Sequence, residues 1–241
     1  MFSVTTKKQY WSWLDSQITQ PKEHTLKEIQ DAFILSRFRN VKGKRILEVG
    51  GGDSRVARLL GRNNEVWLID GFEGKDGGPG KVPALPGVKI VIGYMGQNLK
   101  EIPSNYFDYV FSISVIEHLR VQQYVDCFRD ISRVLVPGGQ TIHAIDLYLY
   151  DDPDEGERAT GLKTRLDMYL NTPTLAGGSL RWQDPPEITR DLTASAKFAF
   201  NSMATLLVWN SIAPALRERR TVTLSCNAEM ILEKSGGHDQ A

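Results

Sequence analysis

Three consecutive glycines flanked by carboxylates are the strongest chemical signal in this sequence. The glycines are Gly50, Gly51 and Gly52; the apolar stretch Ile46–Val49, which includes Glu48, precedes them and Asp53 follows them. A glycine turn lets the backbone approach a nucleotide-like ligand, because a Cβ atom would block the approach and restrict φ. Carboxylates on both sides of the turn suit a ligand with positive charge better than they suit a pyrophosphate.

A second acidic residue follows at a characteristic distance. Asp70 ends the apolar stretch Glu65–Ile69, about twenty residues after Glu48. This spacing is typical of a βαβ unit whose second strand ends in a carboxylate that binds the hydroxyls of a ribose. The alternative is an Asp that only caps a turn. The glycine turn upstream favours the ribose interpretation.

The elements that must position these residues alternate between buried strands and amphipathic helices. Strands are predicted at 46–49, 65–70, 88–92, 107–113 and 141–147, and a helix with Tyr124, Phe128, Ile131 and Leu135 on one face is predicted to end at Pro137–Gly139. The alternation indicates an α/β fold with a doubly wound, mostly parallel sheet. Right-handed crossovers place the carboxyl ends of the first four strands around one crevice.

The remaining segments divide the single domain into four parts. Residues 1–40 form an N-terminal helical segment, 41–150 the α/β core, 151–220 a cap or insertion, and 221–241 closing strands and a tail. Within the first part, the Thr25–Glu28 capping box predicts a helix that runs to about Phe38. The cap is expected to be irregular, with a short helix near 166–170 and another over 198–216. Strands are expected at 221–226 and 229–234.

One connection lacks the usual helix. Residues 71–87 are rich in glycine and proline and show no helical periodicity, although a crossover between parallel strands normally contains a helix. The sequence predicts a loop here, which is either a flap near the ligand or an ordinary exposed connection.

Composition limits the partners and the compartment. The chain has 241 residues, with 29 Lys and Arg against 29 Asp and Glu, so zero net charge gives no general attraction to nucleic acid. Cys127 and Cys226 lie far apart in apolar segments, which indicates buried thiols rather than a disulfide. With no signal-peptide core and no bilayer-length apolar run, we expect a cytoplasmic protein with a small-molecule substrate and no membrane span. The sequence leaves its oligomeric state open.

These motifs, taken in order, resemble those of a known family. The stretches ILEVGGG, Asp70, FDYVFSISVIEHL and ISRVLVPGG resemble the class I S-adenosylmethionine-dependent methyltransferases, in particular the type 11 branch with a Glu-His pair after the fourth strand. The resemblance covers roughly residues 40–150. It implies a Rossmann-like methyltransferase sheet, S-adenosylmethionine as cofactor, S-adenosylhomocysteine as product and no metal.

The resemblance also implies roles for individual residues. Glu48 would act on the methionine ammonium, and Asp70 would bind the ribose. The other cofactor-binding residues would be Gly50, Gly51, Gly52, Met95, Gly96, Ile113 and Ser114. Two positions depart from the family pattern: Ser54 replaces a glycine, and Tyr94 replaces an acidic residue that accepts from the adenine amino group. Gln97 or Asn98 are the alternative acceptors.

Candidates for the acceptor end of the site follow the fourth and fifth strands. His118 is the first candidate for a general base, which an alcohol acceptor would require, and its alternative role is helix capping or packing. His143 lies inside a predicted strand and is expected to be a core residue. Asp146 and Tyr148 end that strand and are candidates for orienting a substrate. The acidic turn of Asp151, Asp152, Asp154 and Glu155 lacks accompanying ligands and is expected to be solvated rather than metal-binding.

The sequence thus predicts an enzyme that methylates oxygen or nitrogen of a small or medium-sized metabolite by in-line displacement. One alternative is a nicotinamide-dependent oxidoreductase, which Arg55 disfavours because the dinucleotide pattern has a glycine at that position. The other is a non-catalytic cofactor-binding protein.

Overall fold

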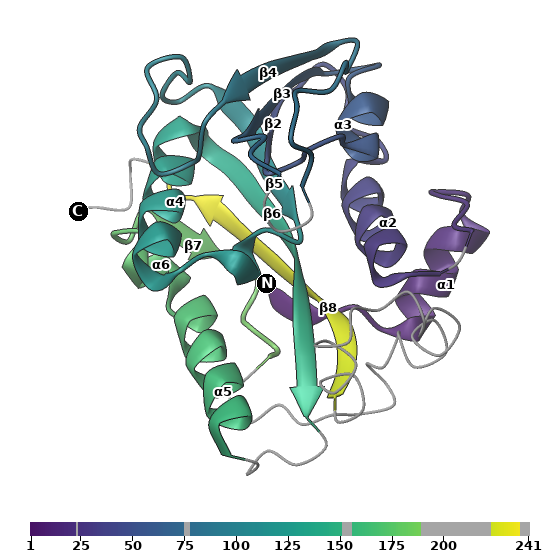
Figure 1. Cartoon of the computed structure of the whole chain (residues 1–241), viewed down its shortest axis with the longest axis vertical. Helices are drawn as coiled ribbons and strands as arrows, with labels where there is room; N and C mark the ends of the chain where they lie inside the picture. Colours follow the sequence, from purple (N-terminus) through teal and green to yellow (C-terminus); the bar gives the residue numbers. More distant parts are fainter. Residues whose placement is uncertain (23, 75–77, 151–155, 189–222, 237–241) are drawn as a thin grey trace.

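A twisted sheet of eight strands forms the centre of the protein (Figure 1). This computed structural model describes residues 1–22, 24–74, 78–150, 156–188 and 223–236. The strands are β1 (Phe2–Val4), β2 (Arg45–Val49), β3 (Glu65–Asp70), β4 (Val88–Ile92), β5 (Phe107–Ile113), β6 (Leu135–Tyr150), β7 (Leu180–Trp182) and β8 (Thr223–Lys234). Their order is β1-β8-β6-β5-β2-β3-β4, with β7 also paired to β8. Strands β2 to β6 are parallel, and β8 is antiparallel to its three neighbours.

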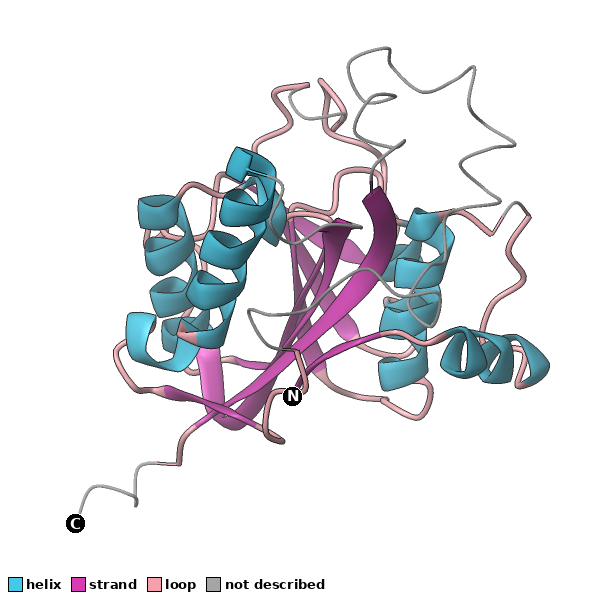
Figure 2. Cartoon of the chain, turned by 90° about the horizontal axis from the view of Figure 1, so that it is seen from below, coloured by secondary structure: helices cyan, strands magenta, loops and turns pink. Residues whose placement is uncertain are grey.

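Helices cover both faces of this sheet, which Figure 2 shows edge-on. The helices are α1 (Lys7–Asp15), α2 (Leu26–Phe38), α3 (Arg55–Leu60), the 3-10 turn η1 (Ile116–His118), α4 (Val121–Val134), α5 (Gly156–Leu170) and α6 (Thr172–Leu175). Apolar residues of α2 and α3 pack on one face, and those of α4 and α5 pack on the other. The predicted doubly wound α/β sheet is confirmed. The predicted stripe of Tyr124, Phe128 and Ile131 is buried in the second layer.

Helix α2 begins where the sequence predicted. Thr25 Oγ1 accepts from the Glu28 N–H, and the Glu28 carboxylate accepts from the Thr25 N–H, which completes the capping box. Ile29, Phe33 and other apolar residues are buried, so the helix is fixed against the sheet with its N-terminal turn beside the carboxyl ends of β2 and β5. The described parts of the 71–87 connection contain no helix, as predicted.

The C-terminal half of the sheet differs from the prediction in two places. Pro137–Gly139 do not end the preceding helix, because α4 stops at Val134 and these residues lie within β6. The β5–β6 register shifts between Phe107 and Tyr109, so an irregularity absorbs the proline and glycines without ending the strand. The two predicted closing strands are one continuous strand, β8, because Asn227 and Ala228 keep their pairing with β6.

The N-terminal and cap segments also contain structure that periodicity did not reveal. The segment 1–40 is not purely helical, since Phe2–Val4 form the edge strand β1 against β8. Three residues are too few for a two-residue period to be detected. In the cap, the helix predicted near 166–170 is the end of the longer α5. The helix predicted over 198–216 lies outside the described residues.

Candidate active site

The loop after β2 requires glycine for steric reasons. Gly50 has φ +67°, and a Cβ atom there would lie 2.6 Å from Cγ2 of Val115. A Cβ atom on Gly51 would lie 2.5 Å from Cδ of Glu48, and one on Gly52 would lie 2.8 Å from Cδ of Pro79. These separations are shorter than real Cβ contacts, so only glycine fits. The backbone of this loop therefore lies directly against the carboxyl group of Glu48.

Glu48 is a buried acid with one unsatisfied oxygen. It is paired in the sheet with Leu68 and Phe111, so its side chain lies on the face covered by α2 and α3, and it is only 2% exposed. Burial raises the pKa of Glu48 to about 8; a hydrogen bond with Ser54 and the charge of Lys27 oppose the shift. Its Oε2 atom has no hydrogen-bond partner among the described residues.

Asp70 connects the end of β3 to the glycine loop. Its Oδ2 atom accepts from the Gly52 N–H at 3.0 Å, and its Oδ1 atom accepts from the Phe72 N–H at 2.7 Å. A carboxylate oxygen has two lone pairs, so each oxygen retains one for a further donor. The Gly50 N–H donates to the Ile69 carbonyl in the same region. Glu48, Asp70 and the three glycines thus form one compact group at the carboxyl ends of β2 and β3.

Met95 and Gly96 lie in a turn after β4 that α4 holds in place. Met95 is buried in the apolar layer beneath α4. Asp130 of α4 accepts from the N–H groups of Gly96 and Asn98, at 2.8 and 3.3 Å, and forms an ion pair with Arg133. The side chain of Asp130 is only 5% exposed, so its carboxylate interacts mainly with these protein groups rather than with solvent. The position of this turn is therefore set by α4.

Tyr94, which replaces the expected acid, lies against the end of β3. A Cβ atom on Gly71 would lie 2.1 Å from the phenolic oxygen of Tyr94, so Gly71 leaves the space that the ring occupies. Gln97 Oε1 accepts from the Tyr94 N–H at 3.1 Å, which closes the turn. Tyr94 is thus next to Asp70, and the Gln97 amide oxygen already has one donor.

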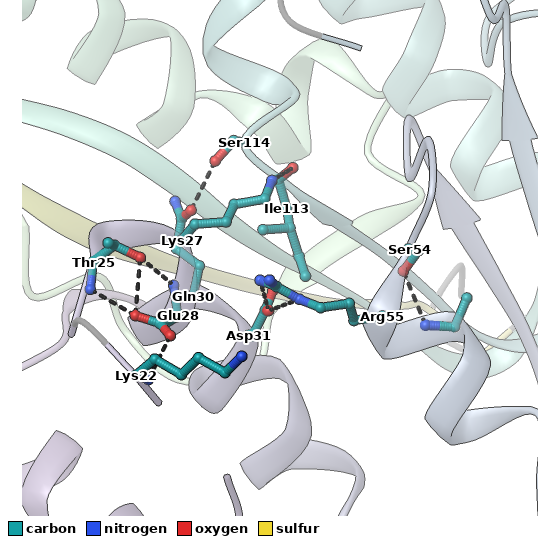
Figure 3. Close-up of polar contacts among 11 residues, drawn as sticks. Lys22, Thr25, Lys27, Glu28, Gln30, Asp31, Ser54, Arg55, Ile113 and Ser114 are labelled. Atoms are coloured by element: carbon teal, nitrogen blue, oxygen red, sulfur yellow. Dashed lines mark hydrogen bonds and ion pairs between the residues drawn. The ribbon is translucent and has the colours of Figure 1, made fainter. Parts of the chain in front are cut away.

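Ser114 contacts side chains of two other elements, α2 and β6, and Figure 3 shows its contact with Gln30 of α2. It follows β5 with φ +52°, and its Oγ is 2.7 Å from Gln30 Oε1 of α2 and 2.8 Å from Asp146 Oδ1 of β6. Gln30 Nε2 donates to the same Asp146 oxygen at 2.7 Å. The neighbouring Ile113 is buried, and its carbonyl accepts from Lys27 Nζ. The structure therefore brings Ser114 and Asp146 together through a helix that sequence motifs did not connect to them.

The Glu-His pair after β5 separates into two different environments. His118 is exposed at the end of η1. Glu117 is directed inward, where its Oε1 atom accepts from the Asp146 N–H at 3.1 Å. Burial, followed by the charge of Asp146, raises the pKa of Glu117 to about 8. Of the two residues, Glu117 rather than the predicted base His118 contacts Asp146.

The remaining candidates are distributed as follows. His143 is a fully buried core residue, as predicted: its ring nitrogens bond to Ser112 and Thr141, and burial lowers its pKa to about 3. Tyr148 is partly buried two residues beyond Asp146 on β6. The acidic turn of 151–155 lies outside the described residues. Elsewhere in the described chain, no group of three acidic, histidine or cysteine side chains could hold a metal ion.

Sequence reasoning missed the contribution of α2. Lys27, Gln30 and Asp31 project from this helix toward the ends of β2, β5 and β6, and Asp31 forms an ion pair with Arg55 (Figure 3). The polar face of α2 was visible in the sequence. Its proximity to Glu48 and Ser114 depends on how the helix crosses the sheet, which no local pattern encodes.

The arrangement fits the S-adenosylmethionine that the motifs imply. The cofactor carries an ammonium and a sulfonium, and the buried Oε2 of Glu48 lacks the donor that an ammonium would supply. The glycine loop leaves room for a close backbone approach, and Asp70 retains acceptor capacity for ribose hydroxyls. A pyrophosphate in the same place would face two carboxylates.

Comparison with known proteins agrees with this fit. Residues 47–143 match a family model described as a methyltransferase domain. No curated protein matches the sequence.

Solved structures with the same fold include three methyltransferases. One is described as a putative sarcosine dimethylglycine methyltransferase from Galdieria sulphuraria (TM-score 0.56, 13% identity, covering 86% of this chain and 85% of that one). Another is a geranyl diphosphate C-methyltransferase from Streptomyces coelicolor, solved with S-adenosylhomocysteine (TM-score 0.55, 11% identity, covering 86% of this chain and 77% of that one). The third is a phosphoethanolamine N-methyltransferase from Haemonchus contortus (TM-score 0.52, 16% identity, covering 86% of this chain and 52% of that one). Residues 47–143 therefore match a methyltransferase domain, and the chain shares its fold with these methyltransferases.

Proposed function

We propose that this protein transfers the methyl group of S-adenosylmethionine to a small or medium-sized metabolite, at oxygen or nitrogen. The observation that carries the proposal is the buried, unsatisfied Oε2 atom of Glu48 beneath Gly51. A buried acceptor without a donor destabilises a protein by about 1–3 kcal/mol, so the site is better satisfied when a cation is bound. Bound S-adenosylmethionine supplies an already activated electrophilic methyl group.

The cofactor-binding residues each have a distinct task in this proposal. Glu48 accepts from the methionine ammonium. Gly50, Gly51 and Gly52 let the backbone of the loop lie close to the cofactor. Asp70 accepts from the ribose hydroxyls while it keeps the loop in place through the Gly52 N–H. Met95 and Gly96 border the adenine. Ile113 and Ser114 line the cofactor from the end of β5.

Alignment of the acceptor is the main requirement for the reaction, because the donor needs no further activation. Asp146 and Tyr148 are suited to orient the acceptor, since Asp146 accepts from Ser114 Oγ and Tyr148 follows two residues later on the same strand, β6. Residues 151–220 are the proposed substrate cap. The relatives of known structure act, by their descriptions, on phosphoethanolamine and geranyl diphosphate, which supports a small-molecule acceptor. None of the described helices is long and apolar enough to cross a bilayer, and we propose a cytoplasmic location.

Ligand binding tests the proposal directly. We expect isothermal titration to show binding of S-adenosylmethionine and of S-adenosylhomocysteine, and none of a nicotinamide dinucleotide. Tight dinucleotide binding without affinity for S-adenosylmethionine would overturn it and would favour the oxidoreductase.

His118 is the proposed general base if the acceptor is an alcohol. Replacing His118 with Ala should then lower kcat about 100-fold or more while leaving cofactor affinity unchanged, because the side chain is exposed and is not one of the proposed cofactor-binding residues. His118→Gln is the matched variant that keeps polarity but cannot take a proton. Activity of both variants at the wild-type level would show that His118 serves only the η1 turn.

A further inference from the structure

Beyond the cofactor site, two carboxyl groups meet at the ends of β5 and β6. Glu117 Oε1 accepts from the Asp146 N–H at 3.1 Å. The other oxygen, Glu117 Oε2, is shielded from solvent and has no hydrogen-bond partner among the described residues. Together with Glu48, Glu117 thus presents a second buried carboxyl oxygen to which none of the described residues donates a hydrogen bond.

Asp146 is held rigidly beside Glu117. Its Oδ1 atom accepts from Gln30 Nε2 at 2.7 Å and lies 2.8 Å from Ser114 Oγ. Gln30 is fully buried, so this part of the network is fixed by α2. Ser114 connects the carboxyl pair to the proposed cofactor site. The pair is therefore placed next to the cofactor rather than in a separate part of the fold.

The charges around the pair leave it electrostatically unbalanced. The titratable groups that interact with Glu117 are Asp146 from β6 and Tyr169 from α5, and Tyr169 in turn interacts with Arg165 of the same helix. Arg165 Nη1 donates to the Leu119 carbonyl at 2.7 Å. Burial and the charge of Asp146 raise the pKa of Glu117 to about 8, which favours the protonated form of this carboxyl group at neutral pH.

We propose that Glu117 and Asp146 form the subsite that receives an ammonium group of the methyl acceptor, and that the protein is an amine methyltransferase. The inference rests on the proposed function and selects nitrogen over oxygen within it. A phosphate or carboxylate at this position would meet two acids, and a neutral alcohol would leave the negative potential unbalanced. An ammonium satisfies the free oxygen of Glu117 and balances the charge of the pair.

The same pair accounts for the proton that amine methylation must remove. On binding, the ammonium takes the place of the proton on Glu117, which leaves as H⁺. The ammonium N–H then passes one proton to the Glu117 carboxylate, so R–NH₃⁺ and –COO⁻ become R–NH₂ and –COOH. The nitrogen lone pair is thereby exposed for the methyl carbon. Glu117 takes this proton in place of His118.

A cofactor analogue provides the test, because the acceptor itself is unidentified. Sinefungin carries an amine-bearing carbon where S-adenosylmethionine carries the methylsulfonium, so it places an ammonium beside the acceptor subsite. At pH 7 the wild-type protein should bind sinefungin at least tenfold more tightly than S-adenosylhomocysteine, as measured by isothermal titration. In Glu117→Gln and Asp146→Asn the preference should fall toward onefold, while S-adenosylhomocysteine affinity changes little.

The controls separate the possible failures. Glu233→Gln removes a partly exposed carboxylate that pairs with Arg181 and lies on β8 opposite Gln140, six residues before Asp146 along β6, and it should keep the full preference. No preference in the wild type, or a preference that survives in both variants, would overturn the amine subsite. The wild-type comparison decides the question even where a variant fails to fold. If the wild-type protein did not bind S-adenosylhomocysteine at all, that result would instead overturn the proposed function.

Discussion

At the scale of single residues, the site is characterised by buried acids that each keep one carboxyl oxygen without a hydrogen-bond donor among the described residues. Glu48 is 2% exposed, and its carboxyl group lies where a Cβ atom on Gly51 would be. The free energy of a buried unpaired acid is unfavourable, and proteins reduce it by protonation. A buried carboxyl group beside a glycine turn is therefore consistent with a bound cation that donates a hydrogen bond to its free oxygen.

Asp70 provides the prediction that belongs to this scale. Asp70→Ala should weaken binding of S-adenosylhomocysteine by about 1–3 kcal/mol, because a charged acceptor for the ribose and the anchor of the Gly52 N–H are both lost. Titration calorimetry measures the change.

Two further variants define the origin of that loss. Asp70→Asn keeps one acceptor oxygen for the loop and should lose less affinity. Asp53→Ala removes an exposed carboxylate that pairs with Arg58 and should bind normally. Unchanged affinity in Asp70→Ala would show that the ribose binds elsewhere.

At the scale of elements, helices position the site through a few polar contacts. The N-terminal half of α2 contributes Lys27, Gln30 and Asp31, and α4 holds the turn after β4 through Asp130. In both cases a helix on the face of the sheet fixes a loop at its carboxyl edge. The loops thus depend on helix packing for their conformation.

Asp130→Ala tests this dependence. The variant removes the carboxylate that pairs with Arg133 and leaves the N–H groups of Gly96 and Asn98 without their acceptor, so the free energy of unfolding should fall by about 2 kcal/mol or more. Cofactor affinity should fall as well, since Gly96 is proposed to border the adenine. Urea denaturation and calorimetry measure the two effects.

Asp130→Asn is the matched variant, because its amide oxygen can still accept from Gly96. It should lie between the wild type and Asp130→Ala in both measurements. If Asp130→Ala lost stability but kept full cofactor affinity, the turn would not contribute to the adenine site.

At the scale of the whole molecule, strands from both ends of the described chain complete one side of the sheet. Strand β1 pairs with β8, and the Phe2 carbonyl also accepts from the N–H groups of Glu187 and Ile188. Thr5 donates to the buried Glu229 on β8, whose pKa burial raises to about 7. A third buried acid thus joins Glu48 and Glu117.

These acids predict how stability depends on pH. Each raised pKa means that the folded state holds a proton that the unfolded state releases above pH about 4.5. Their contribution to stability is therefore complete below that pH and is lost as pH rises through about 7 to 8. Each group adds a slope of up to about 1.4 kcal/mol per pH unit. Urea unfolding of the cofactor-free protein between pH 5.5 and 8.5 should show the decline.

Glu48→Gln should reduce this slope, since the amide cannot ionise. Glu233→Gln, at a partly exposed position that pairs with Arg181, should leave the slope unchanged. Stability that stays constant or rises across this interval would show that these carboxyl groups are ionised in the folded protein.

Much of the fold was predictable because its signals are local. Strands β2 to β5 are short apolar runs bounded by turn residues, and the capping box of Thr25 located the start of α2. The predicted helix end at Pro137–Gly139 was wrong, because sheet pairing on both sides of β6 outweighed the local preference of proline and glycine for a turn. Strand β1 was missed because three residues carry too short a pattern.

The sequence by itself determined the cofactor class, since the glycine turn, Glu48 and Asp70 lie within one βαβ unit with fixed spacing. Only the tertiary structure brought Gln30, Ser114, Glu117 and Asp146 together, from positions up to 116 residues apart. The physical reason is that a βαβ unit constrains its own ends, whereas contacts between α2, β5 and β6 depend on strand order and helix packing. The methyl donor is thus encoded locally, and the proposed acceptor subsite is created by the fold.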